Sequence, residues 1–113
     1  MSNFSRLPEF DKEFHKLSKK YPSLTEDILK LEKVLTTSPI GFGTNFVTIH
    51  HSPNVKIVKT RLACKSMRDR SLRVIYAYQN IEVTFVYLEI YFKGDKENEN
   101  HSRIENYLKY LEE

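Results

Sequence analysis

The chain has little of what several functional classes require. Its single cysteine, Cys64, excludes an intramolecular disulfide and a cysteine-rich zinc site, and it suits a reducing cytosol. The first ten residues lack the apolar segment of a signal peptide. The longest apolar run, Val83 to Phe92, includes Thr84 and Glu89 and has the length of a strand, so no membrane span is expected. A soluble cytoplasmic protein is the default expectation.

Familiar catalytic motifs are also missing. The chain has three glycines and no glycine-rich phosphate loop, and it contains neither a nucleophile elbow nor an HExxH zinc motif. The neighbouring His50 and His51 point apart and have no carboxylate close by in sequence, so a metal site there is poorly supported. We therefore expect no metal and no other cofactor.

Basic residues are plentiful, and they concentrate in one stretch. Over the eighteen positions from Lys56 to Arg73, seven Lys or Arg residues stand against Asp69, a net charge of about +6 in a chain of +3, so the other 95 residues sum to about −3. The seven are Lys56, Lys59, Arg61, Lys65, Arg68, Arg70 and Arg73. Localised positive charge on predicted strands is typical of a site for a phosphate-bearing partner.

Hydrophobic periodicity predicts two helices in the first third of the chain. From Pro8 onwards, apolar residues recur at spacings of four, three and four up to Tyr21, and Pro22 stops the pattern. Ser23 and Glu26 have the spacing of a capping box at the start of a second helix, which ends near Thr36. The short connection predicts a helical hairpin, and residues 3–6 could add an edge strand.

The rest of the chain alternates like β-structure. Residues 39–54 are expected to form a long loop, with room for a short strand at 46–49. Strands are predicted at 55–64, 72–78 and 81–93, the last apolar on both faces and therefore central. A polar loop then leads to a last helix capped by Asn100 or Ser102. The whole, residues 1–113, is predicted to be one α+β domain: an N-terminal helical hairpin packed on a three- to four-stranded antiparallel sheet, with a C-terminal helix.

The predicted strands bring basic side chains together. Lys59 and Arg61 are two positions apart and point the same way, and Arg73 follows on the next strand. If the strands pair, the three converge, with arginine offering a bidentate fork and lysine a compact charge to a phosphate. The alternative, in which these residues only decorate a solvated face, stays open on pattern alone.

Aromatic residues and a polar loop add further candidates. The last two strands carry Tyr76, Tyr78, Tyr87, Tyr91 and Phe92, which can stack on bases beside a basic face. Core packing explains Tyr76 and Tyr87 better, whereas Tyr91 near the strand end stays open. The loop from Lys93 to His101 is best explained as a solvated turn, with a catalytic loop as the alternative.

Three segments, taken in order, carry a family resemblance. They are Val58-Lys59-Thr60-Arg61-Leu62, Leu72-Arg73-Val74-Ile75-Tyr76, and the run from Leu88 through Lys93-Gly94-Asp95-Lys96 to Asn98. Together they resemble the RelE/ParE superfamily of toxins from type II toxin–antitoxin modules, and the final segment is similar to a RelE/HigB-like subgroup. The resemblance covers nearly the whole chain and implies a helical hairpin packed on an antiparallel sheet.

The resemblance also implies an activity. RelE-like members cleave mRNA in the ribosomal decoding site without a metal, using the ribose 2′-OH as nucleophile and leaving a cyclic phosphate. Their catalytic residues correspond by position to Lys59, Arg61, Arg73, Lys93 or Lys96, with Tyr91 and His101 as candidates for the family's C-terminal aromatic or histidine. Additional RNA contacts are expected from Lys56, Lys65, Arg68 and Arg70. Arginines would stabilise the phosphorane, and a lysine with a depressed pKa, or His101, would take the 2′-OH proton.

The leading hypothesis is therefore a ribosome-dependent endoribonuclease that acts on mRNA and is held inactive by a cognate antitoxin. DNA would be contacted only indirectly, through that antitoxin. The second hypothesis is a ParE-like inhibitor of DNA gyrase that acts by binding, because the same fold carries both functions. The third is a non-catalytic RNA-binding module. The joint presence of Lys59, Arg61 and Arg73 favours the ribonuclease.

Overall fold

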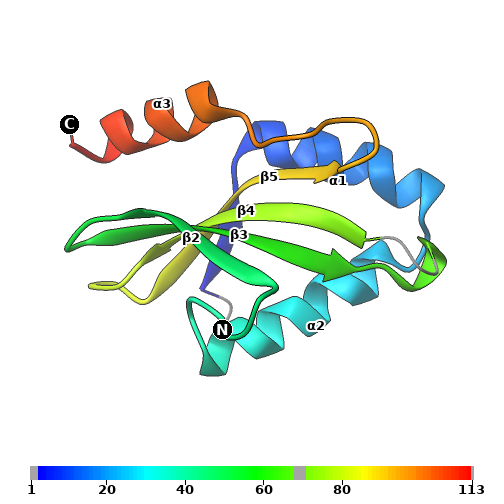
Figure 1. Cartoon of the computed structure of the whole chain (residues 1–113), viewed down its shortest axis with the longest axis horizontal. Helices are drawn as coiled ribbons and strands as arrows, with labels where there is room; N and C mark the ends of the chain where they lie inside the picture. The colour runs from blue at the N-terminus through cyan, green and yellow to red at the C-terminus, as the bar shows by residue number, and fades with distance from the viewer. Residues whose placement is uncertain (1–2, 68–70, 113) are drawn as a thin grey trace.

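The computed structural model describes residues 3–67 and 71–112, which form a sheet with helices on both faces (Figure 1). Its elements are β1 (Phe4–Arg6), α1 (Pro8–Lys20), α2 (Leu24–Thr37), β2 (Phe46–His51), β3 (Val55–Ala63), the 3-10 turn η1 (Lys65–Met67), β4 (Ser71–Gln79), β5 (Thr84–Phe92) and α3 (His101–Glu112). The strand order is β1-β5-β4-β3-β2. The predicted α+β class is confirmed.

The sheet is larger than predicted and is mixed. Strands β2 to β5 pair antiparallel, but β1 runs parallel to β5 and completes a five-stranded sheet. The expectation of three or four antiparallel strands is therefore corrected. The edge strand β1 is held by a stacked pair of rings, Phe4 on Phe85, with centroids 4.5 Å apart. At the opposite edge, β2 extends to His51, two residues further than predicted.

The connection between β4 and β5 is longer than the sequence indicates. The third strand was expected from Ile81, but β5 begins at Thr84. Residues 80–83 form the turn, and Val83 has a positive φ of 54°. That conformation is uncommon for a β-branched residue and takes the chain out of the extended pattern before β5 starts.

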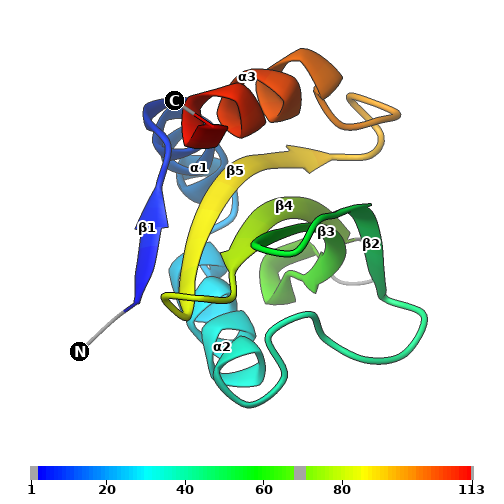
Figure 2. The same ribbon diagram turned by 90° about the vertical axis from the view of Figure 1, so that its left-hand side faces the viewer.

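Two apolar layers hold the helices to the sheet. Both α1 and α2 lie on one face, where Phe10, Leu24 and Ile28 join the main core together with Tyr76 and Tyr87. Helix α3 covers the other face through a smaller cluster that includes Ile104 and Tyr107 (Figures 1 and 2). Tyr76 and Tyr87 are fully buried, which confirms their assignment to the core. In the described ranges, no helix is both long and apolar enough to cross a membrane.

Helix ends follow the sequence in two places and depart from it in one. Pro8 lies in the first turn of α1, and the Asn100 side chain accepts a hydrogen bond from the Arg103 amide (3.0 Å) at the start of α3. The predicted capping box at α2 is wrong. Ser23 Oγ instead donates to Asp27 Oδ2 (2.7 Å), and the Ser23 amide donates to Ser66 Oγ (3.0 Å). The start of α2 is thereby tied to η1.

Candidate functional site

The sheet face under the first turn of α3 carries a row of three functional side chains. Arg61 on β3 lies opposite Arg73 on β4, and Arg73 lies opposite Tyr91 on β5. Directly opposed residues on antiparallel strands have Cβ atoms about 5 Å apart and share one face of the sheet. The structure therefore brings together three residues that the sequence singled out separately.

The two arginines of this row converge on one hydroxyl. Arg61 Nε donates to Ser71 Oγ (3.3 Å) and an Arg73 guanidinium nitrogen donates to the same oxygen (2.9 Å). Arg61 is exposed and Arg73 half-buried. Within residues 3–67 and 71–112, neither arginine forms an ion pair with a carboxylate. Two adjacent guanidinium groups of this kind can bind an oxyanion from two directions.

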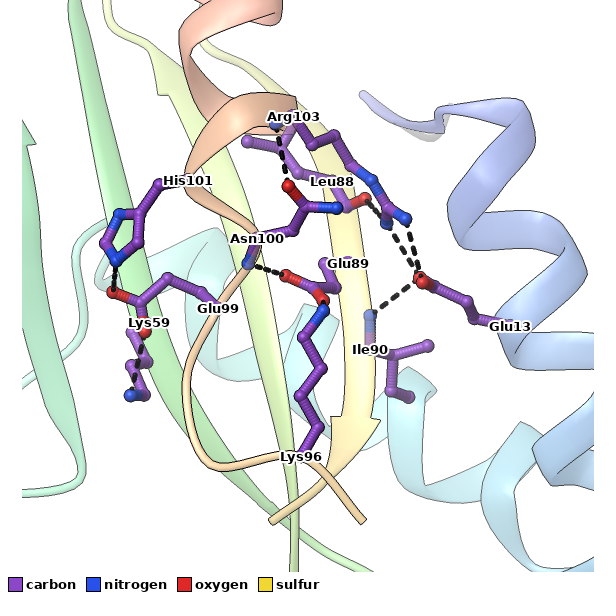
Figure 3. A network of polar contacts seen from close by, with 10 residues as sticks. All are labelled: Glu13, Lys59, Leu88, Glu89, Ile90, Lys96, Glu99, Asn100, His101 and Arg103. Atoms are coloured by element: carbon purple, nitrogen blue, oxygen red, sulfur yellow. Dashed lines mark hydrogen bonds and ion pairs between the residues drawn. The ribbon is translucent and has the colours of Figure 1, made fainter.

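Lys59 lies one step along β3 from this row and is held by the loop that precedes α3. Its ammonium donates to Glu99 Oε1 at 2.9 Å, and Glu99 Oε2 lies 3.7 Å from His101 Nε2 (Figure 3). The Glu99 side chain is largely enclosed, with 10% of its surface exposed, whereas that of His101 is 73% exposed. One carboxylate thus bridges a strand-borne lysine and a surface histidine.

A β-bulge in β5 determines what else reaches this face. Pairing with β4 steps from Tyr87 to Glu89, so Leu88 is an extra residue. Strict alternation would place Glu89 on the same side as Tyr87, in the main core. The bulge turns it towards the α3 face, where its carboxylate accepts hydrogen bonds from Lys96 Nζ and from the Asn100 amide (2.8 Å) (Figure 3).

A second acidic residue fastens the start of α3 to β5 where β1 ends. Arg103 donates to both carboxylate oxygens of Glu13 (2.9 and 3.0 Å) and to the Leu88 carbonyl (2.8 Å), and Glu13 also accepts from the Ile90 amide (3.2 Å) (Figure 3). These contacts satisfy edge groups of β5 that β1 does not reach. They fix the loop that carries Lys96 and Glu99, and His101 at the start of α3, over the sheet.

The electrostatics of the site bear on which residue could accept a proton. Burial alone would lower the pKa of Lys59, but the hydrogen bond to Glu99 and the interactions with Tyr91 raise that pKa above its ordinary value. Lys59 is therefore not the lysine of depressed pKa that was expected to accept a proton. Burial likewise favours raising the pKa of Glu99, yet the bond from Lys59 lowers the pKa of this carboxyl below its usual value.

Tyr91 is the least satisfied polar residue of the site. Its side chain is 6% exposed, and within the described residues its buried hydroxyl makes no hydrogen bond of good geometry, although the Lys59 ammonium lies close enough to interact with it. Burial raises the pKa of Tyr91, and the charge of Lys59 opposes that effect. The Lys96 ammonium lies 5.5 Å from the centre of the Tyr91 ring. A buried unpaired hydroxyl beside cations is a group available to a ligand.

Other predicted residues lie away from this cluster. Lys56 pairs with Tyr78 and, by alternation with Lys59, belongs to the opposite face of β3. Lys65 is exposed in η1, beyond the end of β3, and Lys93 is exposed after β5. Arg68 and Arg70 lie outside the described residues. No cluster of three or more His, Cys, Asp or Glu suited to a metal occurs within the described part of the chain.

Sequence analysis missed Ser71, Glu89 and Glu99. Glu89 lies within an otherwise apolar predicted strand, and this pattern could have indicated a buried, paired carboxylate. Glu99 is one of several acids in the run from Asp95 to Glu99, and sequence alone gives no reason to choose it. Only the fold, which lays this loop across β3, pairs Glu99 with Lys59.

Comparisons with known proteins support the fold alone. No protein-family model matches the chain, and no curated protein matches it in sequence. Among solved structures, a chain of the archaeal RelE–RelB complex from Pyrococcus horikoshii OT3 superposes with a TM-score of 0.63 and 16% identity, covering 82% of this chain and 96% of that one. The architecture described above is therefore RelE-like.

Proposed function

We propose that this protein is the toxin of a type II toxin–antitoxin module and that it cleaves mRNA on the ribosome without a metal. The row formed by Arg61, Arg73 and Tyr91 is the observation that carries the proposal. It joins two arginines without a described carboxylate partner to a buried, unpaired hydroxyl on a RelE-like fold. Such a surface suits the binding of an RNA phosphodiester better than that of a neutral ligand.

Each residue of the row has a defined task in this proposal. Arg61 and Arg73 bind the non-bridging oxygens of the scissile phosphate, and their charge stabilises the phosphorane that forms when the ribose 2′-OH attacks. The Tyr91 hydroxyl donates to the same phosphate and thereby gains an acceptor that it lacks among the described residues. Lys59 and Lys96 line the same face, each paired with a carboxylate in the free protein, and His101 lies at the surface beside Glu99.

The partners follow from the charge distribution and the structural neighbour. The basic stretch that includes Lys59, Arg61 and Arg73 attracts ribosomal RNA and mRNA over the range set by ionic strength. The structural neighbour was solved as a RelE–RelB complex. By analogy, a cognate antitoxin binds this chain and blocks the basic face, and any DNA contact of the complex is made by that antitoxin.

The test is induced expression in bacteria without antitoxin, for the wild type, Arg73→Ala and Lys30→Ala. Lys30 is exposed on α2, on the other side of the sheet, and its replacement by alanine removes the same charge. Translation would be followed by pulse labelling, and mRNA 5′ ends would be mapped. We expect rapid arrest with codon-phased cuts for the wild type and Lys30→Ala, and neither effect for Arg73→Ala.

Two results would contradict the proposal. Arrest with intact mRNA and induction of the DNA-damage response would favour a gyrase inhibitor that acts by binding. Absence of arrest from folded, ribosome-associated wild-type protein would leave an RNA-binding module without chemistry. Circular dichroism of each purified variant separates loss of function from loss of fold.

A further inference from the structure

We propose that Glu99 is the general base of the cleavage reaction, an inference that rests on the proposed function. Glu99 presents a carboxylate on the same face as Lys59, from the loop that crosses the sheet before α3 (Figure 3). Lys59 and Lys96 are occupied as donors to carboxylates, and His101, the other candidate, lies at the surface with 73% of its side chain exposed. The carboxylate is the group whose protonation state and location fit that task.

The first step of the argument is elimination among neighbouring groups. Lys59 is an ammonium that donates to Glu99 at 2.9 Å, so it holds a proton rather than accepting one. Lys96 is likewise committed as a donor to Glu89. Arginine side chains have no acceptor atom, so Arg61 and Arg73 can only donate. Tyr91 is a buried phenol, and burial raises its pKa, which keeps it protonated.

The second step concerns the two carboxylates on this face. Glu89 is 1% exposed, and both of its oxygens are engaged, one by Lys96 and one by the Asn100 amide. Glu89 is thus a structural anchor without free access. Glu99 is more accessible, with 10% of its side chain exposed: Oε1 accepts from Lys59, and among the described residues Oε2 lies 3.7 Å from His101 Nε2, a separation too long for a hydrogen bond. That second oxygen is available to a substrate hydroxyl.

The third step is charge and position. Lys59 and Arg61 are two residues apart on β3, so the Glu99 carboxylate is tied to the strand that also carries a phosphate-binding arginine. The ion pair keeps Glu99 ionised at neutral pH and fixes its orientation. A base that is already deprotonated and immobilised needs no rearrangement before it accepts a proton.

The chemical step then balances. The 2′-O–H bond breaks as its proton passes to the free Glu99 oxygen, and the 2′-oxygen forms a bond to the adjacent phosphorus. The P–O5′ bond breaks, the 5′-oxygen takes a proton from water, and a 2′,3′-cyclic phosphate remains. Glu99 later returns its proton to solvent. Arg61 and Arg73 carry the negative charge that accumulates on the phosphorus oxygens.

The test uses the full-length protein on ribosomes programmed with a short defined mRNA, under single-turnover conditions. Glu99→Gln should cleave about 100-fold more slowly or worse, in line with the usual contribution of a general base. Its affinity for ribosomes carrying a 2′-O-methylated, uncleavable codon should change less than about threefold. Glu97→Gln, on the same loop and exposed, removes the same charge and should cleave at the wild-type rate.

Two further measurements separate a base from a positioning residue. Between pH 6.5 and 8.5, the rate of Glu99→Gln should rise roughly tenfold per pH unit because hydroxide replaces the missing base, whereas the wild-type rate should stay nearly flat. Added formate should accelerate Glu99→Ala in proportion to its concentration and leave Glu97→Ala unchanged.

The outcomes are distinct. A wild type that does not cleave overturns the proposed function and this inference with it. Cleavage by Glu99→Gln within threefold of the wild type, or faster, overturns the inference alone and makes Glu99 an acidic group that substrate displaces from Lys59. Equal losses of cleavage and binding, without formate rescue, also overturn it, because they describe a residue that only shapes the site.

Discussion

Arg61 and Arg73 lie directly opposite one another on β3 and β4, and both donate to the hydroxyl of Ser71, at 3.3 and 2.9 Å. Like charges in opposed positions destabilise a sheet by a few tenths of a kcal/mol, up to about 1 kcal/mol. The arrangement contributes nothing to the fold that a neutral pair would not supply. It does provide two guanidinium groups that converge on one oxygen atom.

This relationship leads to the first prediction, which concerns RNA affinity. Arg73→Ala should reduce the slope of log K against log salt for a short single-stranded RNA by about 0.7, the amount expected for one lost phosphate contact. The free energy of unfolding should change by no more than about 0.5 kcal/mol, because relief of repulsion offsets the lost Ser71 contact. Fluorescence anisotropy at several salt concentrations, with urea unfolding alongside, measures both quantities.

Lys30→Ala is the matched control for this experiment, since it removes one positive charge from the exposed surface of α2. Its slope should match that of the wild type. An equal reduction of the slope in both variants would mean that the RNA responds to total charge and not to the paired arginines.

The second prediction concerns the ion pair between Lys59 and Glu99. A double-mutant cycle with Lys59→Met and Glu99→Gln should give a coupling free energy of about 1 kcal/mol at pH 7, because the pair is partly buried and its geometry is good. The pKa of Glu99 is lowered by its partner, so this coupling should be lost as pH falls through the folded-state pKa, which lies below the ordinary value of 4.5.

At alkaline pH, the contribution of the ion pair to stability changes with pH in the opposite direction. The pKa of Lys59 is raised, so its contribution is complete below the ordinary value of 10.5 and is lost as pH rises through the higher folded-state pKa. Urea unfolding of the four proteins of the cycle at pH 7, and at steps towards lower and higher pH for as long as all four stay folded, measures the coupling. A coupling that does not weaken towards either end of this range would show that the two side chains do not interact through charge.

The third prediction separates two explanations for the start of α2. Ser23→Ala should lower the free energy of unfolding by about 1–2 kcal/mol, because it removes a hydroxyl that donates to buried Asp27 and accepts from the Ser66 amide (2.9 Å). Glu26→Ala, which would break a capping box, should change stability by less than about 0.5 kcal/mol. A larger effect of Glu26→Ala than of Ser23→Ala would instead support a capping box at the start of α2.

Most of the apolar framework could be predicted from sequence because it follows simple periodicity. The stripe from Phe10 to Phe14 in α1 and the alternation of Val58, Leu62 and their neighbours in β3 identify the main core directly. The same alternation correctly placed Lys59 and Arg61 on one face, so the cationic half of the candidate site was predictable.

The position of the acidic residue Glu89 in the candidate site was not predictable, because it depends on a β-bulge. A period of two carried along β5 from Tyr87 would put Glu89 into the main core, and only the extra residue Leu88 turns it to the other face. A bulge of this kind leaves no signature in a single sequence of apolar residues. The parallel pairing of the short strand β1 likewise depends on a tertiary contact, the ring stack of Phe4 on Phe85.

The fourth prediction tests the role of Glu89 as the anchor of the loop before α3. Glu89→Ala should lower the free energy of unfolding by about 2–3 kcal/mol, because it leaves the Asn100 amide without an acceptor and removes the partner of Lys96. Glu82→Ala, an exposed acid in the preceding turn, is the control and should be nearly neutral. Urea unfolding measures both, and equal effects of the two substitutions would refute the role assigned to the buried carboxylate.

The final prediction uses three of the buried tyrosines, Tyr76, Tyr87 and Tyr91, to separate stability from function. Tyr76 donates to the Pro39 carbonyl (2.9 Å) and Tyr87 to Glu32 (3.1 Å), so replacing either by phenylalanine removes a satisfied hydrogen bond and should cost about 1 kcal/mol. Tyr91 has no such partner in the described structure, so Tyr91→Phe should leave stability unchanged or raise it by up to about 1 kcal/mol. Thermal and urea unfolding of the three variants give this ranking.

The same Tyr91→Phe protein should bind RNA phosphate more weakly and cleave on the ribosome at least about tenfold more slowly, because the lost hydroxyl is the one held ready for the substrate. A buried polar group that costs stability in the free protein, yet is needed for activity, is the expected signature of a functional site. Tyr76→Phe is the control, since it should lose stability while cleaving normally at a temperature where it stays folded. If Tyr91→Phe were less stable and fully active, the hydroxyl would have an undetected structural partner, and the row with Arg61 and Arg73 would lose its third member.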